Sequence, residues 1–202
     1  MAVVHESKLL CALLKPYKGL ICYNSKMPEL TEIVGDCSLF MDRILSEITE
    51  QGFDLHDFSQ MDHMCYRTIS MSNYAQKKAQ LQEVAQLLRE TLVNGRPISI
   101  FRLNAPVIHK DWRVDVVELS APKAGSDYKE GLEHAELVLF DDMPTFLQKY
   151  KDKTFEMKSA DRGINPEIGF KLTDGITVKF HLLCLSTVAY LENKLGIDEV
   201  ND

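Results

Sequence analysis

The segment Leu132–Phe140, LEHAELVLF, constrains the fold more than any other part of this chain. In a β-strand, successive side chains point to opposite faces. His134 and Glu136 would then share one face, whereas the residues that alternate with them on the other face are apolar. A strand of this kind is typical of a sheet that buries one face in a hydrophobic core and carries a polar site on the other.

Two other segments, rich in β-branched and aromatic residues, have a similar two-faced pattern: Met61–Thr68 and Ile176–Leu183. His63 and His181 lie on the polar faces of the first and the second. A fourth segment, Trp112–Leu119, carries Glu118. Glu118 shares a face with apolar side chains of its strand, where an unpaired carboxylate would cost on the order of several kcal/mol. We therefore expect Glu118 to be protonated, salt-bridged or bound to a metal. With His134, these residues supply three imidazoles and one carboxylate that can converge.

The composition limits the kind of partner and the cellular location. The chain has 202 residues, 45% of them hydrophobic, which is enough for one compact unit. A net charge of −7 and a pI near 5.4 argue against nucleic acid or an anionic membrane as a partner. Five cysteines without CxxC spacing indicate reduced thiols. The apolar run Leu9–Leu14 is too short to span a membrane and has no clear cleavage site. We expect a cytoplasmic protein with a small-molecule partner; the oligomeric state stays open.

Helical spacing of apolar residues predicts the helices. It predicts one or two helices over 28–51, with a break near Gly35. A long helix is predicted over 72–93, ending at the pair Asn94-Gly95. A short terminal helix is predicted over 185–195.

The predicted order of elements occurs twice. One unit covers about 61–120 and the other about 132–183, and His63 and His134 in their opening strands are 71 positions apart. This repeat predicts an α+β fold with pseudo-twofold symmetry and a curved mixed sheet, apolar outside against helices and polar inside. The expected division of the chain is a leader and helical segment over 1–56 and a sheet-forming domain over 57–202.

Five segments in this order resemble the YecM family of the vicinal oxygen chelate superfamily: MDHMCYR (61–67), NGRPISIFRLNAPV (94–107), VVEL (116–119), EGLEHAELVL (130–139) and DGITVKFH (174–181). The resemblance implies paired βαβββ modules in a curved, partly open barrel-like sheet, with extra N-terminal helices. It also implies a divalent metal held by His63, Glu118, His134 and His181. Glyoxalase-like relatives usually carry a glutamate on the last strand, where this chain has Lys179 and His181 on one face.

Imidazoles with a carboxylate suit Zn²⁺, Ni²⁺, Fe²⁺, Co²⁺ or Mn²⁺ better than Ca²⁺, which takes oxygen ligands. Glu136 is the expected general base, and Arg67 and Lys179 are expected to hold an anionic group of the substrate. Structural alternatives stay open for these residues. The two cations could instead balance the charges of Glu118 and Glu136 in a crowded cavity. Cys65 shares the face of His63 and could bind a soft metal or serve as a small hydrophobic residue.

The leading hypothesis is a metal-dependent enzyme of the vicinal oxygen chelate type, a lyase, isomerase or oxygenase that acts on a small oxygen-rich substrate. The alternative is a non-catalytic module that binds a small ligand on the same scaffold. A third possibility is an interaction protein that docks a partner through the apolar segment Leu9–Tyr23.

Overall fold

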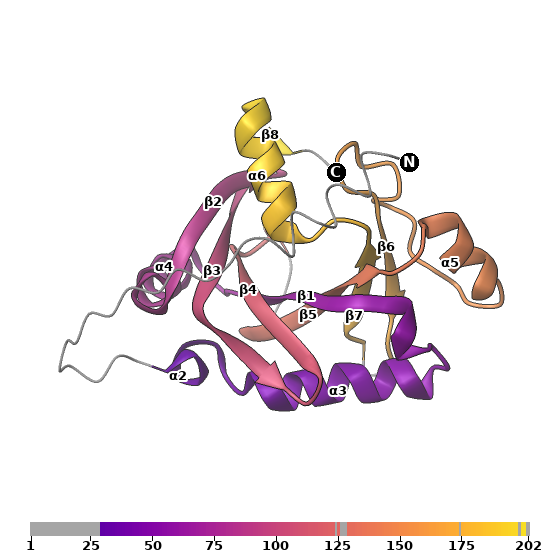
Figure 1. Cartoon of the computed structure of the whole chain (residues 1–202). Coiled ribbons are helices and arrows are strands. Elements are labelled where there is room, and N and C mark those ends of the chain that lie inside the picture. Colours follow the sequence, from indigo (N-terminus) through magenta and orange to yellow (C-terminus); the bar gives the residue numbers. More distant parts are fainter. Residues whose placement is uncertain (1–28, 124, 126–128, 174, 198, 201–202) are drawn as a thin grey trace.

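The computed structural model describes residues 29–200 except positions 124, 126–128, 174 and 198, so the segment Leu9–Tyr23 lies outside the described residues. One mixed sheet with the order β6-β7-β5-β1-β4-β3-β2-β8 organises the molecule (Figure 1). Its strands are β1 (Phe58–Arg67), β2 (Ala85–Val93), β3 (Arg96–His109), β4 (Trp112–Ser120), β5 (Gly131–Leu139), β6 (Glu167–Lys171), β7 (Thr177–His181) and β8 (Glu199–Val200). The edge strands β6 and β8 do not pair with each other within this part of the chain, so the sheet is open.

Two modules with a similar order of elements form this sheet. The first contains β1, α4 (Met71–Val84), β2, β3 and β4, and the second contains β5, α5 (Met143–Lys149), β6 and β7. Each opening strand is parallel to the last strand of its module, and the two opening strands are antiparallel to each other at the centre. Where the first module has β2, the second has only a bridge between Glu156 and Gly169 among its described residues. The α+β fold with a curved, open sheet is confirmed.

The helix predicted over 72–93 is wrong in its second half. Helix α4 ends at Val84, and β2 follows directly as an antiparallel partner of β3. Asn94 and Gly95 have φ angles of 50° and 74°, and positive φ at both positions is typical of a type I′ hairpin turn. The pair therefore connects two strands and does not cap a helix.

Strand β3 is long. It continues through the Asn104-Ala105-Pro106 segment, whose residue types are typical of a turn, and ends at His109. Its register with β4 shifts between Arg102 and Val107, so the irregular segment is accommodated within the strand. The hairpin then closes at Lys110, which has a φ of 53°.

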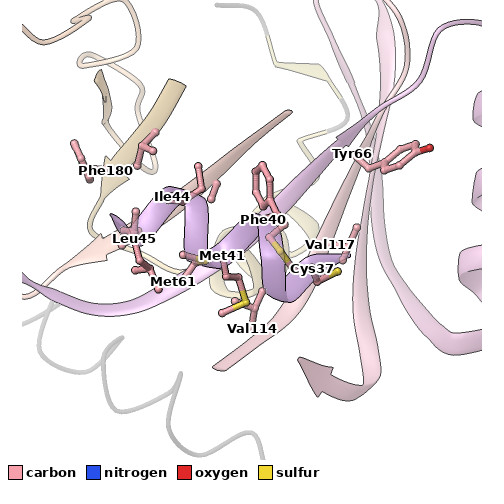
Figure 2. Close-up of a cluster of buried hydrophobic side chains, with 14 of the residues drawn as sticks. Cys37, Phe40, Met41, Ile44, Leu45, Met61, Tyr66, Val114, Val117 and Phe180 are labelled. Atoms are coloured by element: carbon pink, nitrogen blue, oxygen red, sulfur yellow. The ribbon is translucent and has the colours of Figure 1, made fainter. Parts of the chain in front are cut away.

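The main hydrophobic core lies between the sheet and the N-terminal helices. Helices α2 (Leu30–Val34) and α3 (Cys37–Glu50) are separated at Gly35, as predicted, where φ is 91°. The Asp36 side chain caps α3 by accepting a hydrogen bond of 2.9 Å from the Leu39 amide. Figure 2 shows buried side chains of α3 beside the sheet, and these residues include Phe40, Met41, Ile44 and Leu45.

Helix α6 (Leu185–Leu195) packs on the opposite, concave face of the sheet. Phe101 and Val117 belong to the main core, whereas their neighbours Ile100 and Val116 form a separate cluster with Ala189 of α6. Because neighbouring strand residues face opposite sides, α6 and α3 lie on different faces, as Figure 1 also shows. None of the described helices is both long and apolar enough to cross a bilayer.

The cysteines differ in their state. Cys37 and Cys65 are free thiols, as expected. Cys184 is disulfide-bonded, so the expectation of reduced thiols is wrong for this residue. Cys11 and Cys22 lie outside the described residues.

Candidate metal centre

The concave face of the sheet encloses a cavity of about 820 Å³ with walls from both modules. Cys65 does not line this cavity, whereas the predicted ligands, base and anion-binding residues all line it: His63, Arg67, Glu118, His134, Glu136, Lys179 and His181. They come from β1, β4, β5 and β7, the four strands at the centre of the molecule.

The strand register explains why these side chains share one face. Across the antiparallel pair β1 and β5, His63 lies opposite Glu136 and Cys65 lies opposite His134. Across the parallel pair β1 and β4, Cys65 is the partner of Glu118. Registered partners project to the same side of a sheet. The polar side chains of β4, β1 and β5 therefore lie on one face, although these strands belong to two different modules.

The Glu136 carboxylate lies at the centre of the cluster. Its Oε1 atom is 3.5 Å from Nε2 of His63 and 3.4 Å from Nε2 of His134. Its Oε2 atom is 3.3 Å from Nε2 of His181. Lys179 completes the group, with Nζ 2.9 Å from Oε1. Three imidazoles from three strands therefore point the same ring nitrogen at one carboxylate.

These three Nε2 atoms are buried, and none has a hydrogen-bond partner among the described residues. A buried polar atom without a partner costs free energy and indicates a missing ligand. Two donors that each lie about 2.0–2.1 Å from a tetrahedral metal ion are about 3.3 Å apart. The separations of 3.5 Å and 3.4 Å from Glu136 Oε1 to Nε2 of His63 and of His134 therefore fit ligands that share an ion, and these three residues form one cluster of donor atoms.

Carboxylates hold two of the imidazoles from their other side. Asp62 Oδ2 lies 2.9 Å from Nδ1 of His63, and Glu133 Oε2 lies 3.3 Å from Nδ1 of His134. When Nδ1–H donates to a carboxylate, Nε2 keeps its lone pair for a metal ion. The sequence interpretation missed both acids, although each directly precedes its histidine.

Glu118 occupies a different place in the wall. Its Oε1 accepts hydrogen bonds from Ser120 Oγ at 2.8 Å and from Cys65 Sγ at 3.1 Å. Burial raises the pKa of Glu118, but the nearby His63 and His134 lower it more, so the net shift is below the usual value. Three clusters of donor atoms with all separations within 4.8 Å are present in the described part of the chain, and Glu118 belongs to none: Asp62–His63–His181, His63–His134–Glu136 and Cys65–Glu133–His134.

The charges of the cavity favour a cation. Seven carboxylate side chains line it, against five lysine or arginine side chains. Burial lowers the pKa of His63, but the charge of Glu136 and the hydrogen bond to Asp62 reverse this effect and raise it well above the usual value. Burial raises the pKa of Glu136, but Lys179 and the histidines hold it well below the usual range. Positive charge is stabilised at the imidazoles, either as protons or as a metal ion.

Arg67 and Lys179 are both paired with carboxylates of the cavity wall. Arg67 donates to Glu133 Oε2 from Nε at 3.0 Å and from a terminal nitrogen at 2.6 Å. Lys179 bonds to Glu136 and lies 3.1 Å from Glu167 Oε1. Burial raises the pKa of Glu133, but its bonds to His134 and Arg67 lower it to about 2. This pairing favours the charge-balancing alternative for both cations.

Comparison with known proteins places the chain in a family. The family model described as "YecM protein" matches residues 29–192. Protein YecM of Escherichia coli K12 is 30% identical over 170 residues, which cover 76% of this chain and 88% of that protein. An uncharacterised protein of Haemophilus influenzae is 31% identical over 110 residues, 54% of this chain and 57% of that protein. A solved structure described as structural genomics protein EC4020 has a TM-score of 0.68 and 26% identity, covering 87% of this chain and 100% of that chain. This chain belongs to the YecM family.

Proposed function

We propose that this protein is a metal-dependent enzyme of the vicinal oxygen chelate type that acts on a small oxygen-rich molecule in the concave cavity. The reaction class is that of a lyase, isomerase or oxygenase. The observation that carries the proposal is the convergence of three buried, unpartnered Nε2 atoms, from His63, His134 and His181, on the Glu136 carboxylate.

In this proposal the two carboxylates exchange the roles expected from the sequence. Glu136 joins His63 and His134 as a ligand because the donor atoms of these three residues lie within 4.8 Å of one another. His181 contacts the other Glu136 oxygen and groups with His63 and Asp62. Glu118 is half-buried in the cavity wall, and its lowered pKa keeps it ionised at neutral pH. A lowered pKa also makes Glu118 a weaker base, so in this proposal it accepts a proton only from a substrate whose acidity the bound metal ion has increased.

A set of nitrogen and oxygen donors suits Zn²⁺, Ni²⁺, Fe²⁺, Co²⁺ or Mn²⁺, and such an ion would supply Lewis acidity to substrate oxygens. The protein's own residues prepare the site. Asp62 and Glu133 orient His63 and His134 through Nδ1. Lys179 keeps Glu136 ionised, and we assign Lys179 and Arg67 to charge balance in the wall.

Two isosteric variants test the ligand assignment, Glu136→Gln and, as its matched control, Glu118→Gln. The full chain is loaded separately with Zn²⁺, Ni²⁺, Fe²⁺, Co²⁺ and Mn²⁺ and dialysed, and the metal bound per chain is measured. We expect the unmodified chain and Glu118→Gln to retain about one equivalent of the preferred ion, whereas Glu136→Gln loses it. Retention by Glu136→Gln would overturn the ligand assignment, and failure of the unmodified chain to retain any of these ions would overturn the proposed function.

A further inference from the structure

We infer that the substrate has an apolar body in addition to its oxygen-rich head, and that this body lies against the side of β3 and α6 that faces the cavity. The inference rests on the proposed function and assigns the cavity a second subsite. We call this second part the apolar subsite, formed by Ile98 and Ile100 of β3 and Leu185 and Val188 of α6.

The strand register joins the apolar subsite directly to the proposed metal centre. Ile100 lies opposite Glu118, and Ile98 lies opposite Ser120, across the antiparallel pair β3 and β4. Val116 of β4 is the registered partner of His63. Because registered partners project to one side of the sheet, Ile98 and Ile100 of β3 share the concave face with Glu118 and with the polar residues of β1, β5 and β7.

Helix α6 forms the opposite wall and is held close to the metal ligands. Asp62 Oδ2, which bonds to His63, also accepts a hydrogen bond of 2.8 Å from the Leu185 amide. Farther along the helix, Glu192 forms an ion pair of 3.0 Å with the buried Arg89 of β2. These contacts fix the helix at both ends of its inner face, so the apolar wall has a defined position relative to His63.

The size of the cavity supports a substrate larger than its chelating head. At about 820 Å³ it lies within the range of pockets that enclose drug-sized ligands, roughly 300–1,000 Å³. A metal ion and two coordinating oxygens occupy a small part of this volume. Part of the remainder borders the apolar subsite, where an aliphatic or aromatic body of several carbons would be removed from water.

A series of n-alkyl hydroxamates tests the inference, because each member carries the same pair of adjacent chelating oxygens and differs only in its apolar chain. The metal-loaded full chain is titrated with acetohydroxamate, butanohydroxamate, hexanohydroxamate and octanohydroxamate. We expect the dissociation constant to fall roughly twofold to fourfold per added methylene until the apolar subsite is filled.

Matched substitutions locate the subsite. Val188→Ser and, as a second variant that does not alter α6, Ile98→Ser should flatten the dependence on chain length while leaving the affinity for acetohydroxamate within about twofold. Tyr190→Ser is the control, because Tyr190 lies on the same helix and is 50% exposed. In Tyr190→Ser, the dissociation constant should fall with the length of the alkyl group as it does in the unmodified protein.

The outcomes separate the two proposals. Acetohydroxamate binding without any gain from longer chains would overturn this inference alone. If longer alkyl groups increased the affinity of Val188→Ser and Ile98→Ser as much as that of the unmodified protein, the inference would also be overturned, since the alkyl group would then bind elsewhere. If the chain retained no metal and bound no acetohydroxamate, the proposed function would fail and the inference with it.

Discussion

At the scale of single residues, the acid that precedes each central histidine determines which ring nitrogen faces the cavity. Asp62 is 3% exposed and bonds to Nδ1 of His63, while Glu133 does the same for His134 in the other module. Each acid therefore selects the tautomer that presents Nε2. In metal sites, partners of this kind orient the imidazole and increase its basicity.

The variant Asp62→Asn tests this role. Removing the charge of the partner should weaken metal binding by about 10-fold to 100-fold, because His63 is then less basic and less firmly oriented. Affinity is measured by competition with a chromophoric chelator. Asp115→Asn is the control, since Asp115 pairs with Arg113 outside the cavity. Equal affinities for Asp62→Asn and the unmodified chain, with both folded by circular dichroism, would contradict the orienting role.

Alternation along the strands was sufficient to predict that His63, His134, Glu136 and His181 face one cavity. It could not predict Asp62, because neighbours in a regular strand point to opposite faces, whereas β1 has a register shift between Met61 and His63. The alternation of side chains along a strand also shows which face each residue is on, but it gives no distances between side chains of different strands. For this reason the sequence did not distinguish Glu136, which touches all three imidazoles, from a carboxylate elsewhere in the wall.

At the scale of elements, the main error concerned α4 and β2. The residues after Val84 include leucine, glutamine and glutamate, which favour helices, and their apolar spacing extends the helical pattern. Pairing with β3 along Ala85–Val93 outweighs this local preference. The Asn94-Gly95 pair contained the signal for a hairpin, but the same pair also commonly ends helices.

Gly95→Ala tests the hairpin turn. An alanine at a φ of 74° is strained, so we expect the free energy of unfolding to fall by about 1–2 kcal/mol. The control is Gly163→Ala, where φ is not positive and no atom lies within 4 Å of an added Cβ. Urea denaturation measures both variants. A Gly95→Ala chain as stable as Gly163→Ala would contradict the assigned turn geometry.

Helix α3 contributes to stability through its buried face. Ile44 is fully buried in the main core, as part of the cluster in Figure 2, and Ile44→Ala should lower the free energy of unfolding by about 2–5 kcal/mol. Leu39 lies on the same helix and is 68% exposed, so Leu39→Ala should change it by less than about 0.5 kcal/mol. Similar losses in the two variants would show that α3 does not pack on the sheet as described.

At the scale of the whole molecule, the repeat in the sequence predicted two modules that share one sheet. In the structure, each module begins with a strand that carries a histidine and ends with a strand parallel to it, in agreement with the repeat. The sequence did not indicate that the modules divide the cavity unequally. The second module supplies His134, Glu136 and His181, whereas β3 of the first supplies the apolar wall. That division depends on the strand order, which local patterns do not specify.

The proposed function depends on one divalent ion bound where His63 and His134 meet Glu136. Anomalous diffraction from crystals of the metal-loaded protein, recorded above and below the absorption edge of the bound ion, tests it most directly. We expect a single strong peak within about 2.0–2.2 Å of a carboxylate oxygen of Glu136 and of Nε2 of His63 and His134. A peak at Cys65 and Glu133 instead, or no peak on the concave face, would contradict it.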